Sequence, residues 1–347
     1  MKIRATVDYE QLRQIGVGQG LNSTVYLAKD PQLAGELAVK EVPLSSFPNT
    51  AGYFTEAQAM FAADHPNVAP VLWAGTTASH ICMAMPFFRN GSLADKAGAG
   101  PLRLSDVIRY GQDVVAGLGS IHRAGYIHFD VKPSNVLISD TDSGLVADFG
   151  QSRAFGPGGV VSIPQMYRYC VPPEWFSGAA MTTLADVYQV GLLLYRIANG
   201  EDHWKKQIPL PTALAAKVTA GRFPDRSLFL PHVPDPLRRV IRKALHPDPV
   251  RRYQSASELG AALGRVPVRL NWRCSPGPAG EITWEADRDG QPSLLIELAP
   301  GSGGGWDVKM FTKGSTLRRQ GASTYWRTNI KRTEAERHLS AHFKEIA

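Results

Sequence analysis

The spacing of hydrophobic and polar positions changes along the chain, and each change predicts a different element. Before residue 90, short runs of alternating character predict strands. Between residues 102 and 123, apolar residues recur every three or four positions, which predicts a long amphipathic helix. Residues 187–198 are apolar on almost every side and predict a helix buried in a core.

From residue 266 onward, the apolar period shortens again. Alternating residues predict four short strands at 281–286, 293–298, 306–311 and 323–328. Glycine- and proline-rich stretches at 275–278 and 301–305 predict a linker or turn and a flexible loop. Thr333 and Glu336 have the spacing of a capping box and predict a terminal helix. We expect a small antiparallel sheet with one helix.

The composition is that of a folded globular protein. The chain has 347 residues, of which 44% are hydrophobic and 20% are charged, so a sizeable core and about two domains are expected. The formal net charge of +7 is a modest excess for this length and is compatible with an ordinary surface or with one basic patch.

The cysteines and the apolar runs predict where the protein is located. Cys82, Cys170 and Cys274 are far apart and lack the spacing of metal ligands, which favours a reducing compartment. The first residues have no apolar signal core, and no apolar run reaches the roughly 18 residues of a membrane span. We expect a cytoplasmic protein without a membrane segment.

The strongest chemical signal lies between residues 126 and 150. Asp130, Lys132, Asn135 and Asp148 occur there at short spacings, on loops flanked by strand-like apolar residues. Phosphoryl transfer to a hydroxyl needs such a set. One carboxylate accepts the hydroxyl proton, a lysine neutralises the moving phosphoryl group, and an amide and a second carboxylate hold a metal ion.

This region resembles the eukaryotic-like serine/threonine protein kinase family, whose pattern is His-Arg-Asp-x-x-x-x-Asn followed by Asp-Phe-Gly. The resemblance covers about residues 10–264 and implies an α+β fold with a β-rich N-terminal lobe and a mainly helical second lobe. It implies Asp130 as the base, Lys132 as a γ-phosphate contact, and Asn135 and Asp148 as ligands of Mg²⁺ or Mn²⁺. The implied reaction transfers the γ-phosphate of ATP to a serine or threonine of a protein substrate.

The resemblance also divides the chain into three parts. Residues 1–88 would form the N-terminal lobe and hinge, and residues 89–265 the helical lobe. Residues 266–347 resemble no family that we identify and are expected to form a small α+β accessory domain.

Residues upstream of the motif would form the ATP site. A glycine-rich turn contains Gly18 and Gly20, and Ser23 stands where the family has a third glycine. Lys40 ends an alternating strand and would contact the α- and β-phosphates. The remaining implied nucleotide contacts are apolar or lie between the lobes: Val25, Ala38, Met85, Pro86, Phe88 and Leu137.

A short helix is predicted at residues 50–62, with Phe54, Ala57 and Phe61 on one face. The resemblance implies that Glu56 of this helix pairs with the strand lysine; without that lysine, a solvated charge would be the better interpretation.

Ser92 and Asp95 follow the hinge. They lie near the position of a ribose hydroxyl in the family, and they equally suit the cap of a helix.

Several residues would have structural roles. Phe149 and Gly150 complete the Asp-Phe-Gly pattern, and the sequence ending at Glu174 resembles Ala-Pro-Glu. In the family, the counterpart of Asp186 braces the catalytic loop, and the counterpart of Arg252 pairs with the glutamate. These are landmarks of peptide kinases, so a small-molecule kinase is disfavoured.

The chain departs from the family pattern at functionally important positions. Phe129 replaces the arginine that pairs with a phosphate on the activation segment, and phenylalanine cannot make a charge-assisted hydrogen bond. We therefore expect activity without activation-segment phosphorylation. Lys132 favours serine/threonine specificity. Tyr167 and Cys170, however, stand where threonine and tyrosine are usual, which leaves that preference open.

Residues 308–332 contain no acidic residue. Basic residues alternate there with Phe311, Tyr325 and Trp326. This pattern is typical of single-stranded nucleic-acid binding, but it also suits a small core with a solvated basic rim, or a surface that docks a partner protein. The basic residues are Lys309, Lys313, Arg318, Arg319, Arg327, Lys331 and Arg332.

Besides a nucleic-acid-binding regulator with kinase output, two functions from different classes remain. The leading one is an active kinase whose C-terminal module recruits a substrate or a regulator. The alternative is a pseudokinase, a nucleotide-binding scaffold that acts through its C-terminal domain. Ser23 and Phe129 favour the scaffold slightly, whereas the complete set of lysine, base and metal ligands favours the enzyme, because a scaffold needs no proton acceptor.

Overall fold

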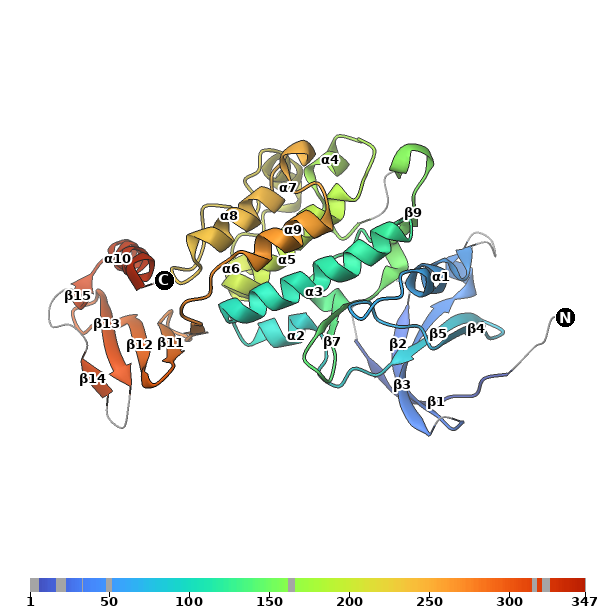
Figure 1. The fold of residues 1–347 in the computed structure, drawn as a ribbon, viewed down its shortest axis with the longest axis horizontal. Coiled ribbons are helices and arrows are strands. Elements are labelled where there is room, and N and C mark those ends of the chain that lie inside the picture. Colours follow the sequence, from blue (N-terminus) through green and yellow to red (C-terminus); the bar gives the residue numbers. More distant parts are fainter. Residues whose placement is uncertain are drawn as a thin grey trace.

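The protein has two lobes followed by a small sheet-and-helix domain (Figure 1). The structure is a computed structural model that describes residues 6–16, 23–32, 34–47, 52–161, 166–313, 317–319 and 325–346. Among these residues, no helix combines the length and the apolar character needed to cross a bilayer.

A five-stranded antiparallel sheet forms the first lobe. Its strand order is β1 (Glu10–Ile15), β2 (Thr24–Asp30), β3 (Gly35–Pro43), β5 (His80–Pro86) and β4 (Trp73–Thr76). Along β3, Ala38 faces the main core, whereas Leu37 and Val39 pack into a second cluster on the opposite face of the sheet. This alternation follows from the two-residue period of a strand.

Helix α1 (Thr55–Ala62) differs from the prediction in its start and in its buried face. On the face expected to carry Phe54, Ala57 and Phe61, Ala57 packs against the core but Phe61 is 79% exposed, and the fully buried residues are Ala59 and Met60. Glu56 and Met60 are one helical turn apart, so the face that turns inward is the one that directs Glu56 to Lys40.

Two long helices form the centre of the second lobe. Helix α3 (Leu104–Arg123) buries one stripe of residues, as its period predicts, and α5 (Leu184–Asn199) is buried almost all round. Figure 1 shows α3 crossing the lobe, with α9 along its side. The remaining helices are α2 (Leu93–Gly98), α4 (Pro173–Phe176), α6 (Glu201–Lys205), α7 (Pro211–Thr219), α8 (Asp235–Ala244) and α9 (Ala256–Gly264).

Two small hairpin-like sheets position the loops of this lobe. In one, β6 (Tyr126–Ile127) pairs with β9 (Arg153–Ala154); in the other, β7 (Val136–Ile138) pairs with β8 (Gly144–Val146). Single turns of 3-10 helix occur at Leu44–Ser46, Pro133–Asn135, Phe149–Gln151, Pro157–Gly159, Arg168–Cys170 and Pro249–Arg251.

The C-terminal domain is an antiparallel sheet with a core of its own. Its strands run in the order β10 (Arg273–Pro276), β11 (Ile282–Arg288), β12 (Gln291–Pro300), β13 (Trp306–Lys313) and β14 (Leu317–Arg319), and β15 (Arg327–Ile330) also pairs with β13. Helix α10 (Arg332–Ile346) adds Ala335, Leu339 and Phe343 to the core of this domain. The predicted sheet and helix are therefore confirmed.

Two local expectations in this domain were wrong. Residues 275 and 276 belong to β10 rather than to a linker, because they pair in register with β11. Helix α10 begins at Arg332, so Thr333 lies inside the helix and forms no capping box. Glu336 instead forms an ion pair with Arg332 at 2.8 Å.

Candidate active site

A buried lysine joins the two lobes at the candidate site. Lys40 Nζ, on β3, lies 2.7 Å from Glu56 Oε1 on α1 and 2.7 Å from Asp148 Oδ1 in the second lobe. Burial acts to lower the pKa of Lys40, but the two carboxylates outweigh it and raise that pKa. Burial likewise acts to raise the pKa of Asp148, but the Lys40 ammonium holds it at about 2. The Lys40 ammonium therefore pairs with two carboxylates, so this group of three side chains carries one negative charge in excess.

The two carboxylate oxygens of Asp130 differ in their contacts. Lys132 Nζ lies 2.7 Å from Asp130 Oδ2, and Asn135 Nδ2 donates to the same oxygen at 2.8 Å. Asp130 Oδ1 is buried and has no hydrogen-bond partner among the described residues. A buried carboxylate oxygen without a donor is costly, which suits an atom that accepts a proton from an incoming group.

The catalytic loop is held from behind by α5. The carboxylate of Asp186, which is fully buried, accepts hydrogen bonds from the backbone N–H of His128 and of Phe129, both at 2.9 Å. It also lies 2.7 Å from His122 Nε2. Burial acts to raise the pKa of Asp186, but these contacts lower it overall. The carboxylate thus fixes the backbone directly before Asp130.

Gln189 is a second brace that sequence reasoning missed. Its Oε1 accepts from the N–H of Val131 at 2.9 Å, and its Nε2 donates to the carbonyls of Phe129 at 2.8 Å and of Cys170 at 3.1 Å. A fully buried glutamine in an apolar helix requires partners, and that requirement was the available signal.

Two residues of the site have a left-handed backbone. The φ angle is +64° at Phe129 and +61° at Asp148, where side chains larger than glycine are uncommon. Such conformations persist when the surroundings determine them, as the α5 contacts do at Phe129. Gly150 lies close behind Asp148, since an added Cβ there would be 3.3 Å from Asp148 Oδ1 and 3.5 Å from Lys40 Nζ.

The donor set fits a hard divalent cation bound together with phosphates. Lys40 occupies Asp148 Oδ1, which leaves the second oxygen of that carboxylate available. The amide nitrogen of Asn135 is used by Asp130, and among the described residues its oxygen accepts only a long contact of 3.4 Å from Ser134. Magnesium is usually held by one or two protein oxygens plus substrate phosphates, and this pair meets that requirement.

The residues expected around adenine form an apolar patch where the lobes meet. Ala38 pairs with Met85 across β3 and β5, and both belong to the main core. Val25, Phe88 and Leu137 are partly buried and pack against it.

The other residues expected near the nucleotide lie at the ends of strands and helices or outside the described residues. Pro86 ends β5, and Ser23 lies just before β2. Gly18 and Gly20 lie outside the described residues. Ser92 and Asp95 form a capping box at the start of α2, with Ser92 N donating to Asp95 Oδ2 at 2.8 Å. The capping interpretation of these two residues is therefore confirmed.

The chain is similar to a known family over most of its length. The family model described as "Protein kinase domain" matches residues 9–261. The chain belongs to the protein kinase family. The serine/threonine-protein kinase PknJ of Mycobacterium tuberculosis is 28% identical over 315 residues, covering 84% of this chain and 52% of PknJ. Pkn2 of Myxococcus xanthus is 31% identical over 267 residues, covering 74% of this chain and 32% of Pkn2. PrkC of Bacillus subtilis is 28% identical over 263 residues, covering 74% of this chain and 40% of PrkC.

These relatives confirm the resemblance to the eukaryotic-like serine/threonine kinases and the two-lobed fold. The chain spans about half the length of PknJ and a smaller share of the other two proteins.

A buried ion pair ties the kinase activation segment to the end of the helical lobe. Arg252 Nη1 and Nη2 donate to the two carboxylate oxygens of Glu174 at 2.7 and 2.6 Å. Arg252 is only 1% exposed and also donates to the carbonyls of His246 and Leu184. The bidentate geometry fixes the segment where it leaves the active site.

The side chain of Phe129 lies in an apolar cluster. Phe129 is fully buried with Ile127, Val161, Met181 and Ala185. Val161 and Met181 also exchange backbone hydrogen bonds of 3.0 and 3.1 Å across the activation segment. The residue that replaces the family's arginine is thus surrounded by apolar side chains.

Tyr167 of the activation segment lies over the catalytic loop. Lys132 Nζ is 5.0 Å from the centre of its ring, within the range of a cation–π contact. The tyrosine is 51% exposed, and its ring meets Tyr169 edge-to-face at 6.1 Å. An aromatic ring therefore lies beside the lysine that holds Asp130.

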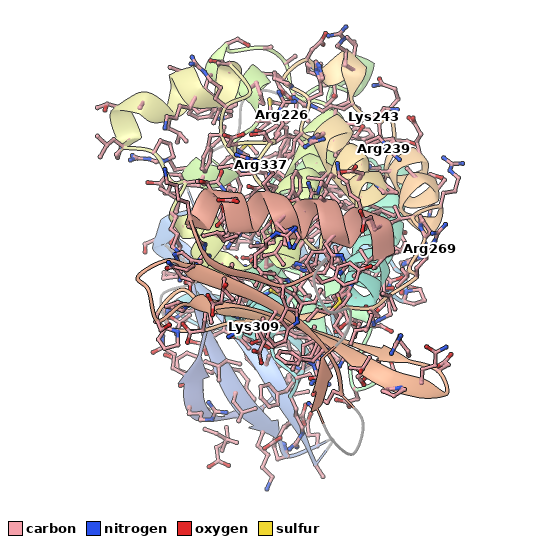
Figure 2. The ribbon with its side chains drawn as sticks, turned by 90° about the vertical axis from the view of Figure 1, so that its left-hand side faces the viewer. Arg226, Arg239, Lys243, Arg269, Lys309 and Arg337 are labelled. Carbon is pink, nitrogen blue, oxygen red and sulfur yellow. The ribbon has the colours of Figure 1, made fainter. Side chains whose placement is uncertain are left out.

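The basic run of the C-terminal domain is partly neutralised by acids outside it. Lys309 pairs with Asp307 at 3.1 Å, and Lys313 pairs with Glu285 at 2.8 Å. Because of these ion pairs, the described part of the run does not form a continuous basic track. Positively charged side chains also occur on the helical lobe, where Figure 2 shows Arg239.

The aromatic residues of this run pack against the domain. Trp326 lies edge-to-face on Phe311 at 5.3 Å and donates to the carbonyl of Met310 at 3.0 Å, while Tyr325 packs on the domain core. These contacts favour the interpretation of a small core with a charged rim.

Proposed function

We propose that the chain is an active, ATP- and Mg²⁺-dependent serine/threonine protein kinase. The observation that carries the proposal is Asp130, whose Oδ2 is held by Lys132 and Asn135 while its buried Oδ1 has no partner among the described residues. A serine or threonine hydroxyl that approaches Oδ1 would donate its proton there as the oxygen attacks the γ-phosphorus of ATP.

Each residue of the site has a role in this proposal. Lys132 neutralises charge on the transferred phosphoryl group, and Lys40, held by Glu56, contacts the α- and β-phosphates. The ion pairs of both lysines fix them where negative charge accumulates, so little reorganisation is needed during transfer. Phe149, Gly150, Glu174, Asp186 and Arg252 support this arrangement without touching substrate.

The nucleotide and the metal would occupy the space between the lobes. Val25, Ala38, Met85 and Leu137 would enclose adenine, with the backbone of Pro86 and Phe88 at its edge; Gly18, Gly20 and Ser23 would approach the phosphates. Asn135 and Asp148 would hold Mg²⁺, or Mn²⁺ in its place. The ion, when bound, neutralises the β- and γ-phosphates.

We further propose the division into lobes at 1–88 and 89–265 and an accessory domain at 266–347. The separate apolar core of the C-terminal sheet supports it. The accessory domain would recruit a protein substrate or regulator; its partly paired basic residues make nucleic acid a weaker candidate. The free, buried cysteines support a reducing, cytoplasmic location.

Transfer of labelled γ-phosphate from ATP to serine- and threonine-containing peptides tests the proposal. Replacement of Asp130 by Asn should lower the rate by about 10²–10⁴-fold, because the general base is lost. Binding of a fluorescent ATP analogue should stay within about twofold, since the nucleotide contacts lie elsewhere. Asp140→Asn, an exposed aspartate of the same lobe, is the matched control and should behave as the wild type.

The same experiment separates the enzyme from the pseudokinase. A wild-type chain that binds the nucleotide but transfers no label with either Mg²⁺ or Mn²⁺ would be a scaffold. Equal rates for Asp130→Asn and the wild type would remove Asp130 from the mechanism.

A further inference from the structure

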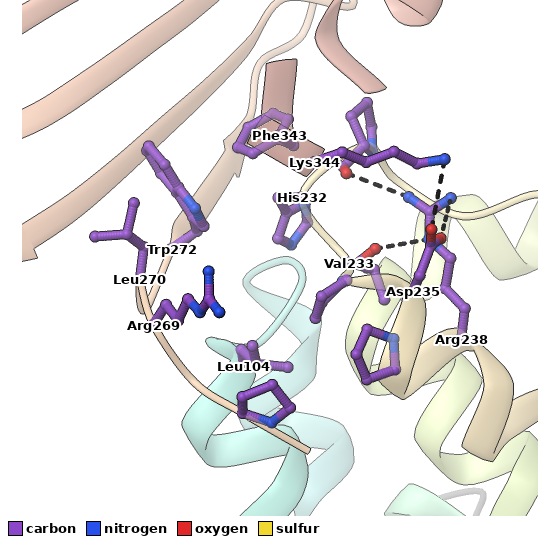
Figure 3. A pocket seen from close by; sticks show the side chains of 14 residues that line it. Leu104, His232, Val233, Asp235, Arg238, Arg269, Leu270, Trp272, Phe343 and Lys344 are labelled. Atoms are coloured by element: carbon purple, nitrogen blue, oxygen red, sulfur yellow. Dashed lines mark hydrogen bonds and ion pairs between the residues drawn. The ribbon is translucent and has the colours of Figure 1, made fainter. Parts of the chain in front are cut away.

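A cavity of about 310 Å³ lies where the helical lobe meets the C-terminal domain (Figure 3). One wall comes from the start of α3 and the segment before α8, and the other from the chain leading into β10 and from the end of α10. The walls are largely apolar, with Leu104, Val233, Leu270, Trp272 and Phe343 among the lining residues. The junction is also fixed beside the cavity, where Asn271 Nδ2 donates to Ser105 Oγ at 2.7 Å.

His232 places a single polar group in these apolar walls. It is only 6% exposed, and its Nδ1 accepts a hydrogen bond of 3.0 Å from the indole Nε1 of Trp284 in the C-terminal domain. Burial, assisted by the nearby charge of Arg238, lowers the pKa of His232 to about 3, so the ring is neutral.

The neutral ring of His232 carries its proton on one defined nitrogen. Because Nδ1 accepts, the ring proton is on Nε2. In the part of the chain that the structure describes, Nε2 has no hydrogen-bond partner. Figure 3 shows the ring of His232 directed toward the cavity, between Arg269 and Val233. A ring N–H that opens onto a cavity can donate to an acceptor on an incoming ligand.

The charges around the cavity are mostly positive. Three cations, Arg238, Arg269 and Lys344, line it together with one carboxylate, Asp235. Lys344 lies 3.4 Å from Asp235, and Arg238 donates to the carbonyl of Val233 at 2.6 Å. Arg269 is exposed at the cavity, where it can approach a bound anion.

We propose that this cavity binds a small organic molecule with an apolar, ring-sized body and one carboxylate. The body would lie against Trp272 and Phe343, and the carboxylate would accept the His232 Nε2 proton and approach Arg269. The volume lies at the lower end of the range for ligand pockets, which favours a molecule of one or two rings. The ligand would contact both the helical lobe and the C-terminal domain and thus stabilise their junction. This proposal does not depend on kinase activity.

Isothermal titration of the full chain with 2-naphthoate tests the site. We expect saturable 1:1 binding with a Kd below about 1 mM, as befits a ligand of this size. The neutral isostere 2-naphthamide should bind about tenfold more weakly or worse, because it cannot form the charge-assisted contacts.

Two variants locate the binding. Arg269→Glu should weaken naphthoate binding by about tenfold or more. Arg239→Glu is the matched control, because Arg239 is also an exposed arginine, carries the same charge change and does not line the cavity; it should stay within about twofold (Figure 2). Leu270→Trp fills the cavity and should abolish binding.

Three results would overturn the proposal. They are no saturable binding by the wild type, equal losses for Arg269→Glu and Arg239→Glu, and naphthamide binding as tight as naphthoate binding. A Leu270→Trp chain that is folded, as shown by its unfolding midpoint, and still binds naphthoate would also overturn it. If that variant does not fold, the arginine pair alone decides.

Discussion

At Phe129, the main chain of the catalytic loop and the contact with the activation segment are held in different ways. The backbone N–H of Phe129 donates to Asp186 and its carbonyl accepts from Gln189, so polar groups of α5 fix the main chain. Its side chain is buried among apolar residues that include Val161 of the activation segment.

The difference matters because the two kinds of contact specify structure to different degrees. Hydrogen bonds to a buried carboxylate are directional, and they are costly to leave unmade, so they specify one backbone geometry. Apolar contacts depend on volume and tolerate substitutions of similar size. The loop that must place Asp130 is held by the first kind, whereas the Phe129 side chain, which replaces the family's arginine, meets the activation segment through the second. Polar contacts hold the end of that segment, where Arg252 pairs with Glu174.

Removing the polar brace should have the largest effect. In Asp186→Ala, the partly buried His122 side chain and two backbone N–H groups lose their acceptor. We expect the free energy of unfolding to fall by about 3–5 kcal/mol, measured by urea denaturation, and phosphoryl transfer to be lost.

The matched control is Asp106→Ala. Asp106 lies on α3 and forms a partly exposed ion pair of 3.1 Å with Arg109, so its loss should cost less than about 1 kcal/mol. If Asp186→Ala were no more destabilising than this control, the polar brace would not be what holds the loop.

This contrast also explains how much the sequence could predict. The types and spacings of Asp130, Asn135 and Asp148 follow from the chemistry, so the candidate site could be predicted from them, whereas the two-lobed fold was implied by the family resemblance that they carry. Gln189 could not be assigned, because its partners are 19 and 60 residues away in the sequence and a glutamine has no chemical signature.

The buried face of α1 illustrates another limit. The apolar spacing grouped Phe61 with Phe54 and Ala57 on one face, but Phe61 is exposed, and the side of the helix that carries Met60 and brings Glu56 to Lys40 turns inward. Such a choice depends on a contact between elements and cannot be made from one helix alone. The C-terminal strands could be predicted from their two-residue period, whereas the pairing of the basic residues with acids such as Glu285 could not.

The buried hydrogen bond from Trp284 to His232 joins the C-terminal domain to the helical lobe, and it should make stability depend on pH. The pKa of His232 is about 3 in the folded chain, against about 6.5 in an unfolded chain. Below pH 6.5, unfolding therefore takes up a proton, and the free energy of unfolding decreases as the pH is lowered. The loss of stability due to His232 should be about 1.4 kcal/mol for each pH unit between roughly pH 6 and 4. Above pH 7 this pH dependence should be absent.

Urea denaturation of the wild type and of His232→Gln at several pH values measures this loss. The charges near His232, namely Arg238, Asp235, Lys344 and Arg269, are present in both chains, so the difference between the two isolates the histidine. The wild type should be the more stable chain at pH 7.5, and the gap should narrow as the pH falls. A gap that stayed constant down to pH 4 would show that His232 titrates normally.

A conservative change in the apolar contact should have a smaller effect. Phe129→Leu keeps an apolar side chain among Ile127, Val161 and Met181 and should cost about 1–1.5 kcal/mol in urea denaturation. Transfer activity should stay within about threefold, because the backbone brace does not involve the side chain.

Phosphatase treatment sharpens this result. With apolar contacts in place of an arginine–phosphate pair, treated and untreated wild-type chains should have equal activity. A treated chain that is inactive until it is rephosphorylated would contradict the comparison, because the activation segment would then depend on a phosphate after all.

The smallest effect is expected where the activation segment touches the catalytic loop. The ring of Tyr167, 5.0 Å from Lys132 Nζ, is placed to orient this lysine. A cation–π contact at so exposed a site contributes about 0.5–1 kcal/mol, which corresponds to about two- to fivefold in kcat. Tyr167→Leu should lose this factor with KM for ATP unchanged, whereas Tyr167→Phe, which keeps the ring, should retain the wild-type rate. Equal losses in both variants would instead assign the role to the hydroxyl, and the link between the two regions would then be polar rather than apolar in kind.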